Sequence, residues 1–114
     1  MKILAAIHDL MFSSKVNAAA QGRRLSWLPR GAGVAEQVAK DKPDVLLIDL
    51  GSPKLDAVNA IRSIKSGESK ATVVIGYVDH TREDLIEAAR SAGCDQVMSK
   101  GEFARRLPEL LDGI

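Results

Sequence analysis

Three largely apolar runs, with almost no polar alternation, stand out along the chain at residues 3–7, 45–48 and 72–75. Runs of this length are typical of strands that are covered on both faces, as in a parallel sheet enclosed by helices. Two shorter segments, 25–28 and 96–98, are further strand candidates, which we place nearer the edges of the sheet. The pattern therefore predicts a parallel sheet with both faces buried.

Between these runs the apolar residues recur every three or four positions, which is the period of a helix with one buried face. Thr81 and Ser99 each precede an acid by three positions, as in a capping box. Gly22 and Gly93 stand where helices would end, and Pro108 would kink or restart the last helix. The predicted helical stripes lie within residues 12–20, 34–38, 55–64, 85–92 and 103–114.

Strand and helix thus alternate five times along residues 1–114. Right-handed crossovers fold such a chain into a doubly wound α/β sheet, and its length suits a single domain. In sheets of this kind the functional residues lie beyond the carboxyl ends of the strands. The residues that end each strand are therefore the candidates for a site.

The composition narrows the classes of partner. With 16 Lys and Arg against 15 Asp and Glu, the formal net charge is +1, so no overall field attracts nucleic acid or an anionic membrane. A single cysteine, Cys94, cannot form an intramolecular disulfide, and the first apolar run is too short for a signal sequence or a membrane span. We therefore expect a cytoplasmic protein with neither a nucleic-acid nor a membrane partner.

Charged residues follow three of the predicted strands. Asp9 comes after the first strand, Asp49 after the third, and Lys100 after the fifth. Because the carboxyl ends of parallel strands meet at one edge of the sheet, these three side chains should converge there. Two carboxylates and one ammonium group suit a divalent cation or a phosphoryl group.

Two segments carry a family resemblance. Asp49 follows the apolar run 45–48 and precedes Pro53 by four residues, while segment 87–100 leads from a helix through an Ala-Gly pair to Lys100. This pattern resembles the CheY-like receiver domain of response regulators in two-component signalling, over essentially the whole chain. The resemblance implies a flavodoxin-like, five-stranded parallel (βα)5 sheet in strand order 2-1-3-4-5. It also implies that Asp49 is the phosphoacceptor and that Lys100 is the partner of the phosphoryl group.

The metal-binding acids depart from the receiver pattern. Receivers usually carry two adjacent acids after the first strand to hold Mg²⁺, whereas this chain has His8 followed by Asp9. Only Asp9 and Asp49 therefore match the acidic metal ligands, and histidine is a poor ligand for Mg²⁺. The resemblance establishes no cofactor with certainty, and it implies that a Mg²⁺ site here would have reduced affinity.

The residues of the receiver's conformational switch also differ. The Ser or Thr that closes on the phosphoryl group at the end of the fourth strand has no counterpart, because Gly76, Tyr77 and Val78 are the alignable positions. Val97 stands where receivers have an aromatic switch residue, and Gly101 replaces a proline after the lysine. The resemblance is thus to a receiver with an incomplete phosphorylation switch, a pseudo-receiver.

Structural roles explain some of the same residues without chemistry. Asp49 could cap the turn that follows it, and Asp9 could be the N-cap of the first helix. His8 and His80 could share a transition-metal ion with Asp79, although the sequence supplies no further ligand at a fixed spacing.

Three residues are candidates for an interface. Trp27 lies in an expected edge strand beside arginines, a composition found in interface anchors, although it could equally cover the edge of the sheet. Tyr77 could fill the space left by the missing hydroxyl, or it could contact a partner, as could Val97, on the face formed by the fourth and fifth strands and their helices.

We therefore predict an atypical receiver-like domain that acts through protein-protein contact and is not an enzyme. Its partner would be a histidine kinase, a downstream regulator or a second copy of the chain. The alternative is a genuine Asp49 phosphoacceptor in a phosphorelay. A third hypothesis, a flavodoxin-like domain that binds a small molecule at the same rim, lacks a glycine-rich loop after the first strand. Residues 31–33 match a dinucleotide loop only in part, because Glu36 holds the third glycine position.

Overall fold

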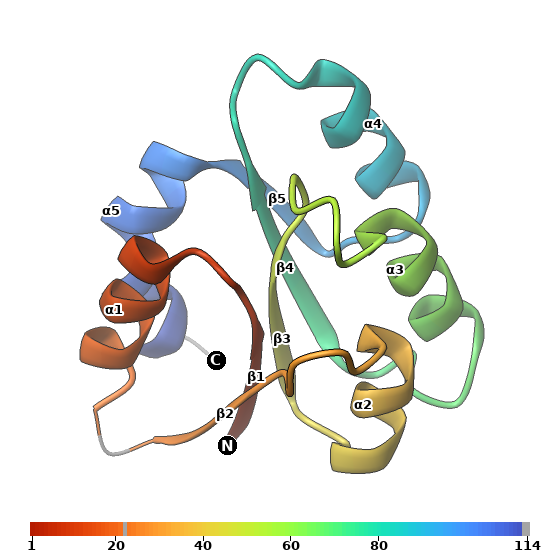
Figure 1. Ribbon diagram of the computed structural model, residues 1–114, viewed down its shortest axis with the longest axis horizontal. Coiled ribbons are helices and arrows are strands. Elements are labelled where there is room, and N and C mark those ends of the chain that lie inside the picture. The colour runs from red at the N-terminus through yellow and green to blue at the C-terminus, as the bar shows by residue number, and fades with distance from the viewer. Residues whose placement is uncertain (22, 113–114) are drawn as a thin grey trace.

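The computed structural model of the protein describes residues 1–21 and 23–112, so the helix end predicted at Gly22 and the last position of the final stripe, Ile114, lie outside the described residues. Five strands alternate with five helices along the described chain (Figure 1). The strands are β1 (Lys2–Ala6), β2 (Arg24–Trp27), β3 (Val45–Asp49), β4 (Val73–Val78) and β5 (Gln96–Ser99). The helices are α1 (Leu10–Ala19), α2 (Val34–Asp41), α3 (Ala57–Ser66), α4 (Glu83–Ser91) and α5 (Lys100–Asp112).

The strands form one sheet in the order β2-β1-β3-β4-β5, and every neighbouring pair is parallel. This confirms the predicted flavodoxin-like, doubly wound topology. Because all the strands run in one direction, the loops after them gather at a single edge, and the residues that end β1, β3, β4 and β5 lie close together there.

Helices cover the sheet on both faces. Helices α1 and α5 lie on one side, and α2, α3 and α4 lie on the other (Figure 1). Successive residues of each strand point to opposite layers, so Ile3 packs in the α1–α5 layer while Leu4 packs in the α2–α4 layer. The two buried layers account for the unalternated apolar runs, since both kinds of position had to be hydrophobic.

Strand β4 is longer than its apolar run predicts. We expected a strand that ends near residue 75 and a loop from Gly76, but pairing continues to Val78. Tyr77 pairs with Asp49 on β3, and Val78 pairs with Ser99 on β5. A glycine and a tyrosine do not extend an apolar pattern, but hydrogen bonding to strands on both sides keeps the backbone extended.

The predicted helix ends have mixed outcomes. Ser99 accepts a hydrogen bond at 3.1 Å from the Glu102 backbone N–H, which is one of the two bonds of the predicted capping box, and Gly93 follows α4 with a left-handed φ of +103°. The cap predicted at Thr81 is wrong, because α4 begins at Glu83 after Arg82. Pro108 does not restart the last helix, since α5 continues through it. No helix within residues 1–21 and 23–112 is long and apolar enough to cross a membrane.

Candidate functional site

A cavity of about 280 Å³ opens at the edge of the sheet where β3, β4 and β5 end. Asp49, Val78 and Lys100 lie in its wall, so the structure brings together two of the three charged residues that we expected to converge. The loops after β3 and β4 supply the remaining lining residues, Gly51, Asp79, Thr81 and Arg82.

Asp49 is the half-buried acid of this cavity. Its Oδ1 accepts a hydrogen bond at 3.0 Å from the Gly51 backbone N–H, which confirms the expected turn-capping role and leaves Oδ2 without an intramolecular donor among the described residues. Burial raises the pKa of the Asp49 carboxyl, and the nearby Asp9 carboxylate adds to this effect. The Gly51 hydrogen bond and the Lys100 charge oppose it, as does His8 more weakly.

Asp9 lies near enough to influence Asp49 electrostatically, but its side chain has a structural role. Its Oδ1 accepts hydrogen bonds from the backbone N–H groups of Met11 at 2.8 Å and Phe12 at 3.2 Å. The predicted N-cap of the first helix is therefore confirmed. Because one oxygen is occupied in this way, Asp9 has one oxygen left for a cation.

The donors for Mg²⁺ are correspondingly few. In the part of the chain that the structure describes, no group of three or more histidine, cysteine, aspartate or glutamate side chains is arranged to hold a metal. Mg²⁺ commonly binds through one or two carboxylates and several waters. One oxygen of Asp9 and one of Asp49 fit that sparse set, and weakened Mg²⁺ binding stays a prediction.

At the end of β4, only one of the three alignable positions reaches the cavity. Val78 lines it, and its Cγ2 lies beside Gly51, as does Asp49 Oδ1, whereas Tyr77 points into the opposite layer, where it packs against Phe12 and Phe103. Gly76 is pressed against Leu50, such that an added Cβ would lie 2.8 Å from the Leu50 Cγ. The wall beside Asp49 is therefore alkyl where receivers place a hydroxyl.

The interpretation of Tyr77 as a contact residue is wrong. Its side chain is fully buried, with ring centroids 4.7 Å from Phe12 and 4.5 Å from Phe103. The phenol hydroxyl has no hydrogen-bond partner among the described residues. Burial raises the pKa of Tyr77, and the charges of Asp49 and Asp9 raise it further. Tyr77 is thus part of the core beneath the site.

Sequence reasoning missed Thr81, which brings a hydroxyl to the cavity from the loop after β4. The Thr81 Oγ1 donates a hydrogen bond to Asp79 Oδ1 at 2.8 Å, and the Thr81 backbone N–H donates to the same oxygen at 2.9 Å. These bonds lower the pKa of Asp79. An acid two residues before a threonine is a recognisable signal of such a turn.

Arg82 is a second lining residue that sequence reasoning missed. Its guanidinium makes two hydrogen bonds to the Asp84 carboxylate, at 3.1 and 3.0 Å. This pairing raises the pKa of Arg82 and lowers that of Asp84. Among the described residues Lys100 makes no ion pair within 4.0 Å, so it is the cation of this cavity that has no close acidic partner.

The proposed histidine metal site is not formed. His80 Nδ1 lies 3.7 Å from Asp79 Oδ1, but His8 lines a different hollow with Arg30 and Lys54. The described residues contain no metal-ligating group that includes either histidine.

Two further apolar residues are exposed near the site. Leu10 and Met11, at the start of α1, are 87% and 63% exposed, and the sequence pattern did not single them out.

Trp27 is 37% exposed at the end of the edge strand β2, and Val97 is half-buried on the other edge strand, β5. Their accessibility is compatible with the interface prediction, which stays a prediction.

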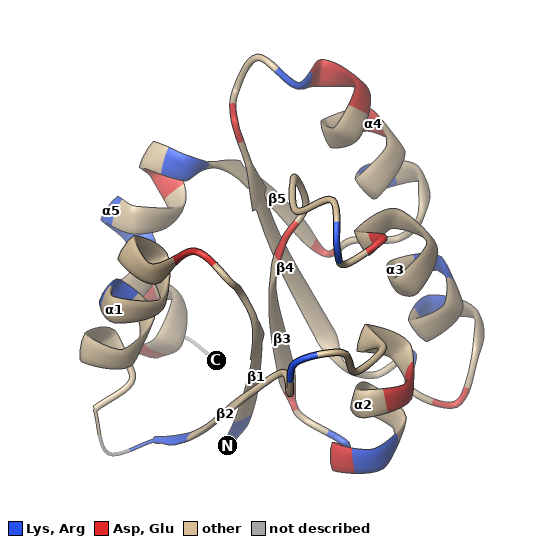
Figure 2. Cartoon of the chain, in the orientation of Figure 1, with Lys and Arg blue, Asp and Glu red and all other residues tan. Residues whose placement is uncertain are grey.

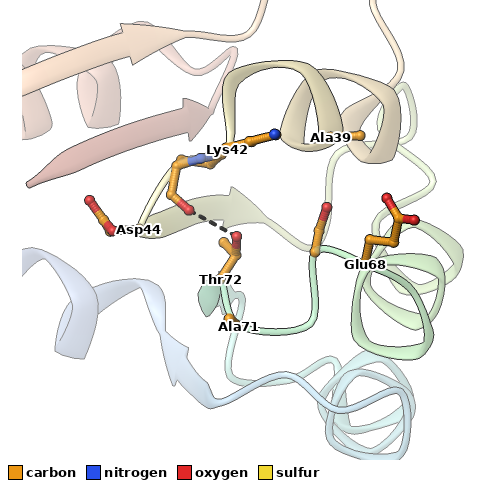
Figure 3. A pocket seen from close by; sticks show the side chains of 8 residues that line it. Ala39, Lys42, Asp44, Glu68, Ala71 and Thr72 are labelled. Atoms are coloured by element: carbon orange, nitrogen blue, oxygen red, sulfur yellow. Dashed lines mark hydrogen bonds between the residues drawn. The ribbon is translucent and has the colours of Figure 1, made fainter.

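A larger hollow, of about 480 Å³, lies at the opposite edge of the sheet, where β3 and β4 begin (Figure 3). There the buried Thr72 Oγ1 donates a hydrogen bond to the Pro43 carbonyl at 2.8 Å (Figure 3). The charged residues around it, Lys42, Asp44 and Glu68, are of both signs. Because its buried hydroxyl is satisfied and its charges are mixed, this hollow shows no preference for a ligand.

Comparisons with known proteins agree with the fold. The chain is 32% identical over 114 residues to response regulator MprA of Mycobacterium leprae, an alignment that covers 97% of this chain and 48% of that protein. It is also 32% identical over 87 residues to probable histidine kinase 2 of Oryza sativa subsp. indica, covering 73% of this chain and 8% of that protein. No family model matches the chain.

A crystal structure of a response regulator from Hahella chejuensis superimposes with a TM-score of 0.84 at 17% sequence identity, covering 97% of this chain and 92% of the other. The likeness to this structure establishes the fold. The chain spans about half the length of MprA and a small fraction of the rice kinase, so the activities of those whole proteins do not transfer to it directly.

Proposed function

Because this chain has the CheY-like receiver fold of response regulators and resembles several of them in sequence, we propose that it signals through protein contacts with its phosphorylation switch uncoupled from its surface. The observation that carries this proposal is Val78, whose side chain forms the cavity wall beside Asp49. An alkyl group at this place cannot hydrogen-bond to a new negative charge.

The residues next to Val78 on β4 also cannot respond to a negative charge on phosphorylated Asp49. A switch needs an element with two arrangements whose balance the modification changes. Tyr77, the neighbour of Val78, is fully buried against two phenylalanine rings, and Gly76 has no side chain that could move. On β5, Val97 supplies no ring that could turn between buried and exposed positions. The ends of β4 and β5 therefore lack a side chain that can change position when Asp49 is phosphorylated.

A partner of this domain would be another signalling protein, either a histidine kinase or a downstream regulator. The contact surface that we propose is the exposed start of α1, where Leu10 and Met11 lie directly after the cap residue Asp9. Adjacent exposed apolar side chains beside a polar rim are typical of interaction sites. This surface borders the Asp49 site without depending on its phosphorylation.

A second function is favoured by the cavity itself, in which Asp49 remains a phosphoacceptor. Its Oδ2 would attack the phosphorus of a phosphohistidine, and the P–N bond would break as its electron pair returns to the ring nitrogen of the donor. Lys100, which lines the same cavity, would neutralise the charge on the phosphoryl oxygens. The Thr81 hydroxyl could then leave Asp79 for the phosphoryl group and replace the missing hydroxyl.

One experiment separates the two functions. The protein is incubated with Mg²⁺ and acetyl phosphate, phosphoryl transfer is read by intact mass, and amide NMR spectra are recorded with and without beryllofluoride. Asp49→Asn is the control for specific modification. We expect little modification, or shifts confined to the residues that line the cavity. Stoichiometric modification of Asp49 would establish the second function, and shifts that spread across α4, β5 and α5 would overturn the uncoupled switch.

A further inference from the structure

A third hollow, of about 360 Å³, lies beside the Asp49 cavity at the same edge of the sheet. It is formed by three loops, with His8 after β1, Arg30 after β2 and Lys54 after β3. These strands are neighbours in the order β2-β1-β3, and the strand order reverses at β1. Ligands of open α/β sheets bind outside the carboxyl ends of the strands at such a reversal.

The side chains around this hollow carry charge of one sign. Arg30 and Lys54 line it together with His8, and the remaining lining residues, Gly31, Ala32 and Leu55, are uncharged. Figure 2 shows basic segments in the loops that lead into α2 and α3. Within the described residues neither Arg30 nor Lys54 makes an ion pair or a side-chain hydrogen bond. By contrast, the Asp49 cavity also contains two carboxylates.

The nearby helix N-terminus does not account for this basic hollow. Glu36, in the first turn of α2, folds back so closely that a Cβ added at Gly33 would lie 1.6 Å from its Oε2. The start of α2 therefore already has an anion of its own chain. Glu36 and Asp56 line an adjoining hollow rather than this one, although the two hollows share four lining residues, Gly31, Ala32, Lys54 and Leu55. The attraction for a ligand comes from the side chains of the three loops.

We propose that the hollow formed by His8, Arg30 and Lys54 binds the phosphate group of a small molecule. The planar guanidinium of Arg30 donates two parallel hydrogen bonds to phosphate oxygens, and Lys54 supplies a point charge. His8 donates a further hydrogen bond from its ring. The volume is that of a small-ligand site, with room for a phosphate and a modest organic group. This site goes beyond the proposed signalling function and does not involve Asp49.

Amide and imidazole NMR titrations at constant ionic strength test the proposal, with inorganic phosphate, adenosine monophosphate and acetate as probes. We expect saturable shifts at residues 8, 30–32 and 54–55 with both phosphate probes, and no saturation with acetate. Arg30→Gln and Lys54→Gln should each weaken phosphate binding about tenfold. Lys15→Gln, which removes an exposed lysine of α1, is the matched control and should leave the affinity unchanged.

The two phosphate probes distinguish the source of the ligand. Tighter binding of the nucleotide supports a phosphorylated metabolite, and equal binding supports free phosphate, both within the proposal. Shifts centred on Asp49 and Lys100, an equal loss of affinity in Lys15→Gln, or saturation by acetate at the same concentration as phosphate would overturn it. Unchanged amide spectra elsewhere in each variant show that the fold is intact.

Discussion

Tyr77 on β4 stacks on Phe103 of α5 with ring centroids 4.5 Å apart and an interplanar angle of 21°. Phe12 of α1 also stacks on Tyr77, and the Phe12 and Phe103 centroids lie 6.1 Å apart, so three mutually contacting rings link the floor of the site to both helices of one layer. Such pairs add about 0.5–1.5 kcal/mol beyond the burial of their area. The stack makes the end of β4 rigid where a receiver switch would require movement.

The unpartnered hydroxyl of Tyr77 gives the first prediction. Removing a buried donor that has no acceptor relieves a desolvation penalty, so Tyr77→Phe should raise the free energy of unfolding by about 1 kcal/mol. Tyr77→Ala, which also removes the ring from the stack, should lower it by about 3–5 kcal/mol. Urea denaturation at pH 7 measures both values. A loss of stability in Tyr77→Phe would mean that a buried water satisfies the hydroxyl.

The strands were predictable because burial on both faces leaves unalternated apolar runs such as residues 45–48, whereas their order was implied by the resemblance to receivers. The last three residues of β4 were not predictable as strand. Gly76 and Tyr77 are held extended by pairing with β3 and β5, which the local sequence pattern does not show. The placement of Asp49 and Lys100 followed from topology alone. The orientation of Tyr77 depended on the strand being longer, since alternation directs successive side chains to opposite layers.

Thr81 was misread for a local reason. A threonine three residues before an acid predicts a helix cap, but Asp79 competes for the same hydroxyl and backbone N–H. That competition shifts the start of α4 to Glu83 and turns Thr81 toward the cavity. The exposure of Leu10 and Met11 was also missed, although both residues lie outside the apolar stripe that begins at Phe12.

Asp9 has a capping role and a possible metal role, which can be separated. Asp9→Ala should lower the free energy of unfolding by about 1 kcal/mol, because two backbone N–H groups at the start of α1 lose their acceptor. Asp9→Asn keeps an acceptor oxygen and should leave stability nearly unchanged. If the free oxygen of Asp9 binds Mg²⁺, Asp9→Asn should still weaken Mg²⁺ binding, measured by calorimetry. Equal Mg²⁺ affinity in Asp9→Asn and the unaltered protein would exclude Asp9 as a ligand.

The ionised carboxylate of Asp49 should lower the free energy of unfolding at neutral pH. Burial raises the pKa of its carboxyl in the folded protein, so the folded state holds the proton more tightly than the unfolded state. The stability linked to this proton is complete below the unfolded pKa of about 3.9 and is lost as the pH rises through the folded pKa. Asp49→Asn should therefore be more stable than the unaltered protein at pH 7, with the difference shrinking in acid.

Denaturation curves between pH 3 and pH 7 test this expectation for Asp49. Glu68→Gln is a suitable control, because Glu68 is exposed and lies at the opposite edge of the sheet from the Asp49 cavity. A lower stability of Asp49→Asn at pH 7 would indicate that Lys100 and the Gly51 hydrogen bond outweigh the effect of burial.

Val78→Thr restores a hydroxyl at the wall of the Asp49 cavity with almost no change in shape. The valine is 1% exposed, so placing a hydroxyl there should cost about 1–3 kcal/mol of folding stability. The introduced hydroxyl can donate a hydrogen bond to a phosphoryl mimic on Asp49. With Mg²⁺ and beryllofluoride, we expect amide shifts to extend from the cavity into α4 and β5 only in this variant. Val73→Thr, at the distant start of β4, is the matched control. If Val78→Thr responds no more widely than Val73→Thr, the missing hydroxyl is not what uncouples Asp49 from the surface.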